Sequence, residues 1–209
     1  MWETGDSGCW HALVLDDKFF SSLQKIDRES ARQVAEAGCP WCGGPLDRSD
    51  YDRKPRGDLF IAATVEPPLR RISFCCRREG CRRRVTPPSV VFLGRRVYLG
   101  AVVLVASVIA RLQRTTAGLA TQVPVTQVPA RTLRRWARWW QTELTATALF
   151  AALRGRLASP VDEARLPCSL LQRLTGSAVE QVAALLKLLA PLTTGSVPDG
   201  ARSPRGAGR

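Results

Sequence analysis

Several features that would suggest a function directly are scarce in this chain of 209 residues. It contains a single histidine, His11, which leaves little room for catalysis by an imidazole group. It has no run of roughly 18 apolar residues, and no charged segment followed by an apolar one opens the chain. We therefore expect neither a transmembrane helix nor export, and the expected location is the cytoplasm.

Acidic residues are scarce in one part of the chain only. The whole sequence has 31 Lys+Arg against 18 Asp+Glu and a net charge of +13. Residues 1–47 have more acidic than basic side chains, whereas residues 48–142 carry a net charge of +14, and residues 97–142 contain no acid. Such a concentrated positive region predicts a polyanionic partner, with nucleic acid favoured over an anionic membrane surface.

Arginine supplies most of this positive charge: 27 of the basic residues are Arg and 4 are Lys. The planar guanidinium group matches phosphate oxygens and guanine edges. A GC-rich genome would also favour Arg codons, although it would not explain why the arginines cluster.

The pattern of apolar residues predicts an α+β fold that is mostly α, with enough apolar content for a core. A run of 14 mostly apolar residues, 97–110, is too short to span a bilayer comfortably, so we interpret it as a buried helix, with membrane insertion as the alternative. Further helices are expected over residues 16–37, 130–144 and 166–192, and short strands over 59–65 and 71–74 around a turn at 66–69.

Cysteine is the unusual component, with seven residues. Cys39 and Cys42 form a C-P-x-C pair followed by two glycines, and Cys76 and Cys81 lie in a second cysteine-rich turn. A tetrahedral zinc site needs four soft ligands from two tight turns, so the spacing predicts a zinc ribbon with structural Zn²⁺ held by Cys39, Cys42, Cys76 and Cys81. Cys75 is the substitute for Cys76.

Two alternatives to zinc remain open, namely a ribbon that has lost its metal and a redox-active cysteine pair. We expect the remaining candidates, Cys9, His11 and Cys168, to be ordinary residues, because the sequence offers no further ligands for a second site.

The helix expected over residues 130–144 is strongly amphipathic. On a helical wheel, its arginines fall in one narrow sector, opposite Leu133, Trp136, Ala137, Trp140 and Leu144. These arginines are Arg131, Arg134, Arg135 and Arg138. Trp139 lies off the apolar face and is expected at the helix flank or against a partner. The pattern favours a DNA recognition helix, with a solvated charged face as the alternative.

The order of these motifs resembles the N-terminal region of insertion-sequence transposases. The resemblance covers roughly residues 39–144: C-P-x-C-G-G, an aromatic-Cys knuckle, the stretch Val-Thr-Pro-Pro-Ser-Val-Val-Phe-Leu-Gly-Arg-Arg, and a segment ending in Thr-Leu-Arg-Arg-Trp. It implies a zinc ribbon followed by a helix-turn-helix. Pro124 falls where the first helix of that motif is expected.

The resemblance does not extend to a nuclease. Transposases of this type hold two metal ions with a separated acidic triad, and the acids after Trp140 lie on segments without expected strands. These acids are Glu143, Asp162, Glu163, Glu180 and Asp199. We therefore expect no catalytic residues and no enzyme activity.

These observations predict a non-catalytic DNA-binding protein related to mobile-element machinery and associated with the nucleoid. Double-stranded DNA is the expected partner, with a transposase or a second copy of the chain as further partners and no membrane. The expected DNA-binding residues are the four helix arginines and the ribbon residues Arg77, Arg78, Arg82, Arg83 and Arg84. The alternatives are a protein–protein adaptor or transcriptional regulator that uses the same ribbon and the Leu-rich C-terminal helices, and an enzyme.

The predicted organisation has five parts. They are an N-terminal helical segment (1–38), the zinc ribbon (39–94), the helix-turn-helix region (95–158), C-terminal helices (159–192) and a disordered tail (193–209).

Overall fold

The computed structural model of the chain describes residues 16–53, 69–93, 98–115, 128–157 and 159–194. The fold is α+β and mostly α, as the sequence predicts. Its elements are α1 (Asp17–Ala37), β1 (Leu46–Arg48), β2 (Tyr51–Arg53), β3 (Leu69–Arg71), β4 (Phe74–Cys76), β5 (Arg84–Val85), α2 (Gly100–Thr115), α3 (Ala130–Arg138), the π-helix η2 (Trp139–Glu143), α4 (Ala148–Arg156), the 3₁₀-helix η3 (Glu163–Arg165), α5 (Cys168–Leu171), α6 (Ala178–Leu189) and the 3₁₀-helix η4 (Ala190–Thr193).

Helix α1 confirms the helix predicted over residues 16–37. The Asp16 side chain accepts a hydrogen bond from the Phe19 amide at 2.8 Å, which caps the first turn. Gly38 ends the helix with a φ of +77°, a conformation that glycine adopts without strain.

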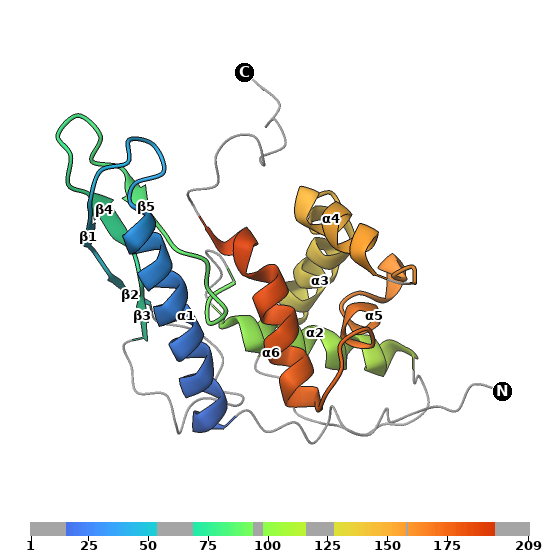
Figure 1. Cartoon of the computed structure of the whole chain (residues 1–209). Helices are drawn as coiled ribbons and strands as arrows, with labels where there is room; N and C mark the ends of the chain where they lie inside the picture. The colour runs from blue at the N-terminus through green and yellow to red at the C-terminus, as the bar shows by residue number, and fades with distance from the viewer. Residues whose placement is uncertain (1–15, 54–68, 94–97, 116–127, 158, 195–209) are drawn as a thin grey trace.

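Helix α1 also joins two clusters of buried side chains. Near its start, Phe19, Phe20 and Leu23 belong to the main core, which the other helices build. Near its end, Ala31 packs with Phe74 and Val85 of the small sheet. Figure 1 shows α1 between the strands and the remaining helices. Because one continuous helix contributes to both clusters, it fixes the ribbon relative to the helical part.

The ribbon contains an antiparallel hairpin with one continuous register. β1 pairs with β4, so that Leu46 faces Cys76, and β2 pairs with β3, so that Tyr51 faces Arg71. The two ladders share this register although residues 49–50 and 72–73 interrupt them. At the interruption, the Ser49 amide donates to the Ser73 carbonyl and the Ser73 amide donates to the Asp50 carboxylate. The polar side chain thus replaces a ladder bond without shifting the pairing.

The bounds predicted for the strand over residues 71–74 are wrong. The segment is split into β3 and β4, and its observed partners are residues 46–53. Alternation of apolar residues gave no signal for this pairing, because β1 and β2 are short and carry mostly charged side chains. The strand predicted over residues 59–65 and its turn fall mainly outside the described residues.

Helix α2 confirms the buried helix predicted over residues 97–110, although it begins at Gly100. Its residues from Ala101 to Ile109 are buried, and α2 contacts both α3 and α6. The indole Nε1 of Trp140 donates to the Ser107 hydroxyl at 3.0 Å, so the polar atom of this buried tryptophan has a partner. None of the helices in the described ranges has the length and apolar character that a membrane span requires.

Helix α3 and the π-helix η2 together occupy the predicted helix over residues 130–144. Trp136 and Trp140 are buried as expected, but the expected place of Trp139 at the flank is wrong, because its side chain is only 9% exposed. In η2 the Leu144 amide bonds to the Trp139 carbonyl, five residues back. This wider turn changes the angular spacing of side chains from that of an α-helix. Trp139 packs edge-on against Trp140, with 4.9 Å between the centres of the two rings.

The C-terminal region forms the two helices α5 and α6, followed by the 3₁₀-helix η4, which confirms helices within residues 166–192. Ser177 and Glu180 form a reciprocal capping box at the start of α6. The leucines of α6 point into the main core. The predicted tail lies almost entirely outside the described residues, and the five-part domain division stays a prediction.

A buried carboxylate, Asp27, connects three segments of the fold. It accepts hydrogen bonds from the Ser89 hydroxyl and from the Val90 amide at 2.7 Å. The Ser89 amide in turn donates to the hydroxyl of Thr193 in η4. Burial raises the pKa of Asp27, while its hydrogen bonds and the charge of Arg71 oppose the rise. Sequence reasoning missed this residue, although an acid on the apolar face of α1 was a usable signal.

We predict that Asp27→Ala lowers the free energy of unfolding by about 2 to 4 kcal/mol, because it leaves buried donors without an acceptor. Asp27→Asn keeps an oxygen for the Val90 amide and should cost less.

The folded-state pKa of Asp27 lies above the unfolded value of 3.8, so the stability of the wild type relative to Asp27→Asn should rise as pH falls through the folded pKa and level off below 3.8. Denaturant unfolding of the three proteins across this range checks both statements. Equal stability of Asp27→Ala and the wild type would contradict the first statement, and a wild-type advantage over Asp27→Asn that does not grow as pH falls would contradict the second.

Candidate metal centre and arginine surfaces

Four cysteine thiols converge at the outer end of the ribbon. The sulfur atoms of Cys39, Cys42, Cys76 and Cys81 all lie within 4.8 Å of one another. The Cys39 and Cys81 sulfurs are 3.7 Å apart, and those of Cys42 and Cys76 are 3.4 Å apart. Four sulfurs bound to one zinc ion at 2.3 Å would be about 3.8 Å apart in a tetrahedron. The four predicted ligands are therefore brought together and could hold a metal ion.

The two turns that carry these thiols hold their sulfurs through backbone amides. The amides of Trp41 and Cys42 donate to the Cys39 sulfur, and the Arg78 and Arg83 amides donate to Cys76 and Cys81 respectively. These bonds stabilise a thiolate and orient it. The first turn needs Gly44, because a Cβ there would lie 3.3 Å from the sulfurs of both Cys42 and Cys76.

The thiols differ in how readily they lose a proton. Burial raises the pKa of Cys39, but the amide hydrogen bonds of its turn and the neighbouring thiols outweigh it and lower the pKa to about 7. Burial raises the pKa of Cys76 to about 12, helped by the thiols of Cys42 and Cys39. A bound cation would stabilise four thiolates side by side, and its binding would displace their protons.

Cys75 is separated from this cluster although it adjoins Cys76. Its thiol points toward the Arg82 carbonyl at 3.5 Å, because successive side chains of β4 face opposite sides of the strand. Cys76 therefore belongs to the cluster, whereas Cys75, the predicted substitute, lies outside it. Cys168 is buried in the main core, as expected for an ordinary residue. Cys9 and His11 lie outside the described residues.

Most ribbon arginines that were expected to bind DNA have partners within the chain. Arg77 forms a salt bridge with Asp47 of β1, and Arg78 donates to the Cys42 carbonyl at 2.9 Å. Arg84 donates to Ser73 and lies over the Tyr51 ring. These three side chains brace the ribbon.

The two remaining ribbon arginines lie on the second cysteine turn. Arg83 lies over the indole of Trp41, with 5.3 Å between its guanidinium carbon and the ring centre. Arg82 is exposed and has a φ of +44°. Its charge helps to lower the pKa of Asp47, after the larger effect of the Arg77 hydrogen bond. All five expected ribbon arginines are exposed; three of them bond to carboxylate, carbonyl or hydroxyl groups of the ribbon, and the other two are Arg82 and Arg83.

The arginines of α3 present a different environment. Arg131, Arg134, Arg135 and Arg138 are all exposed, and the described part of the chain provides no ion pair to any of them. Trp136 and Trp140 anchor the opposite face in the core. The predicted separation into an apolar face and a guanidinium face is therefore present. The preceding helix of the expected helix-turn-helix, around Pro124, lies outside the described residues.

Three of the five acids considered for catalysis have structural contacts, and Asp199 lies outside the described residues. Glu180 caps α6, Asp162 accepts from the Ala164 amide, and Glu163 pairs with Arg154. Within the described ranges, the four cysteines form the one group of three or more His, Cys, Asp or Glu side chains spaced to hold a metal. The expected absence of enzyme activity stays a prediction.

Trp41 is the surface feature that sequence reasoning missed. Its side chain is 40% exposed and lies between Cys39 and Cys42 of the cluster. An aromatic residue inside a C-x₂-C turn is the signal that was available.

Comparison with known proteins gives no match to a family model, to a curated protein or to a solved structure.

Proposed function

We propose that this chain is a non-catalytic DNA-binding protein in which a structural zinc ion organises the ribbon and α3 contacts duplex DNA. The single observation that carries the proposal is the guanidinium face of α3, where four exposed arginines face solvent without an acidic partner among the described residues. Elsewhere in the helical part, Arg154 pairs with Glu163, and Arg173 donates to Ser159 and Pro160.

The geometry of α3 suits the DNA backbone and groove edges. The first turn of α3 has no acidic residue and no side-chain cap, so the positive end of the helix dipole lies beside Arg131. A helix anchored by buried tryptophans holds its guanidinium groups in a fixed arrangement, which lowers the entropic cost of binding phosphate. Phosphate contacts of this kind give affinity and register, and base contacts near the N-terminal end would give specificity.

Zinc is the metal that the ribbon site fits best. Four thiolates in a tetrahedral arrangement leave no open position, so the ion would hold the two turns together and would not activate water. Zn²⁺ with four thiolates carries a charge of −2, which the neighbouring Arg78, Arg82 and Arg83 would partly neutralise.

The relation to mobile elements rests on the sequence resemblance to insertion-sequence transposases. The adaptor alternative relied on Leu-rich C-terminal helices, but Leu185, Leu186 and Leu189 are buried in the protein's own core. Their apolar surface is therefore already covered, and the observations favour nucleic acid as the partner.

Zinc binding is tested by two neighbouring serine substitutions. We expect the wild type to hold about one zinc ion per chain. Cys76→Ser removes a ligand and should lose the metal on dialysis against a chelator, whereas Cys75→Ser should keep it, because the Cys75 thiol points away from the cluster. Elemental analysis and far-UV circular dichroism measure both variants. Retention of zinc by Cys76→Ser, or its loss from both variants, would contradict the assigned ligand set.

DNA binding is tested by charge reversal on α3. If four arginines contact phosphates, the slope of log affinity against log salt should be about −3 to −4. The Arg134→Glu/Arg135→Glu double variant should make the slope less steep by about 2 and weaken duplex binding at least about tenfold. Fluorescence anisotropy with a labelled duplex measures both quantities.

The matched control for that experiment is Lys25→Glu/Arg28→Glu, which makes the same change in net charge at exposed positions of α1. It should keep the wild-type slope. A similar loss in both double variants would mean that net charge alone drives binding, and no measurable affinity for duplex would remove the proposal.

A further inference from the structure

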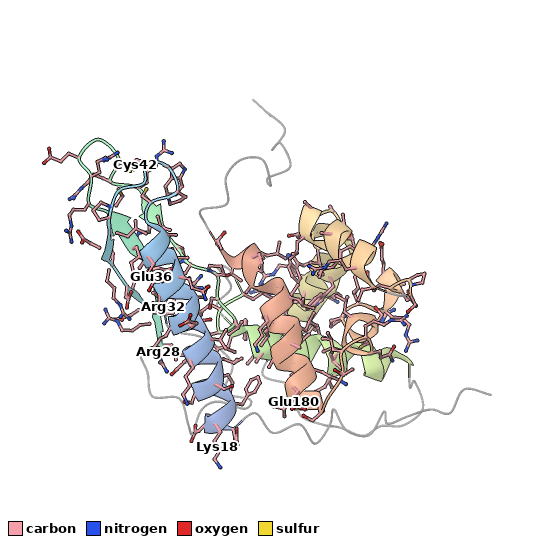
Figure 2. The ribbon with its side chains drawn as sticks, viewed as in Figure 1. Lys18, Arg28, Arg32, Glu36, Cys42 and Glu180 are labelled. Carbon is pink, nitrogen blue, oxygen red and sulfur yellow. The ribbon has the colours of Figure 1, made fainter. Side chains whose placement is uncertain are left out.

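The outer end of the ribbon presents one large apolar side chain to solvent. Trp41 is 40% exposed, and in the described part of the chain no other large hydrophobic residue is exposed. Figure 2 shows the neighbouring Cys42 at the end of the ribbon, beyond the end of α1 and away from α2 to α6. A single exposed aromatic side chain is common on protein surfaces, so the groups around Trp41 decide whether it has a role.

The cysteine turn holds Trp41 in a fixed place. The Trp41 amide donates to the Cys39 sulfur, and the preceding Pro40 restricts the backbone. Arg83, from the second cysteine turn, lies over the indole with 5.3 Å between its guanidinium carbon and the ring centre. The ring is therefore positioned from both turns before any partner arrives. Arg83 lies over one face of the ring, and the side chain of Trp41 stays 40% exposed.

The surroundings of Trp41 indicate the chemistry of that group. The adjacent turn carries the exposed residues Arg78, Arg82 and Arg83 against the single acid Glu79. A protein-docking surface would bring further exposed apolar side chains, and the described residues provide none there. An exposed aromatic ring beside several arginines is instead the combination that stacks on a nucleic-acid base while neutralising its phosphates.

The base must be unpaired. In a duplex both faces of each base are covered by their neighbours, so a flat ring at the tip of a turn reaches base faces only where the strand is open. We infer that Trp41 and Arg83 form a stacking site for an unpaired base of single-stranded DNA or RNA. This inference rests on the proposed function, because it takes the nucleic acid bound by α3 to carry an unpaired segment that reaches the ribbon.

The test compares tailed and blunt duplexes on the full chain purified with its metal. The probes are a fluorescent duplex of about 16 base pairs, the same duplex with a single-stranded tail of about six nucleotides, and the same tail made abasic. Thymidine and ribouridine versions of the tail distinguish DNA from RNA. The abasic tail keeps every phosphate and removes every base, so the difference between the two tails measures stacking and not charge.

We expect the tail with bases to raise affinity about tenfold over the abasic tail. Trp41→Ala should abolish that gain and leave blunt-duplex affinity within about twofold, while Trp41→Phe keeps an aromatic face and part of the gain. Unchanged zinc content and circular dichroism verify the fold of both variants. A gain with either tail chemistry supports the inference and identifies the strand.

Equal affinity for the two tails, or an unchanged gain in Trp41→Ala, would overturn the inference while leaving duplex binding by α3 intact. The opposite combination of results can also be told apart. A Trp41-dependent gain on the tail, with no affinity for the blunt duplex, would support the stacking site and remove the proposed duplex function.

Discussion

The convergence of four thiols is the constraint on which the ribbon depends. Cys39 and Cys42 come from the turn after α1, and Cys76 and Cys81 come from the end of the hairpin, so closing the cluster joins segments that are far apart in sequence. The apolar cluster beneath it is small, with Ala31, Phe74 and Val85 at its centre. So few buried side chains supply little stabilisation, which is the usual reason for a structural metal in a small domain.

The arginines differ in whether acceptor groups of the chain lie within reach of their guanidinium groups. Those near the hairpin find carboxylates or carbonyls within reach: Arg77 meets Asp47, and Arg78 meets the Cys42 carbonyl. On α3 no acid lies on the helix itself, and the core side is filled by tryptophan. Net charge alone would predict one continuous positive surface, whereas the contacts separate arginines that stabilise the fold from arginines that remain open to a polyanion.

Local patterns were sufficient to predict much of this molecule. Helix α1 followed from its apolar positions and the glycine after it, and the cysteine cluster followed from cysteine spacing, because both depend on patterns that are local in the sequence. Three features depended on tertiary context. Asp27 bonds to Ser89 and Val90, more than sixty residues away, and Trp139 is buried in a π-helical turn that the helical-wheel pattern does not anticipate. The pairing of β1 and β2 with β3 and β4 carries no alternation to reveal it.

The most direct test of the central claim is zinc K-edge X-ray absorption on the purified full chain. The account predicts four sulfur neighbours at about 2.3 Å and no nitrogen or oxygen in the first coordination shell. A first shell containing nitrogen or oxygen, or a folded chain that binds no metal at all, would contradict the idea that four thiolates close the ribbon.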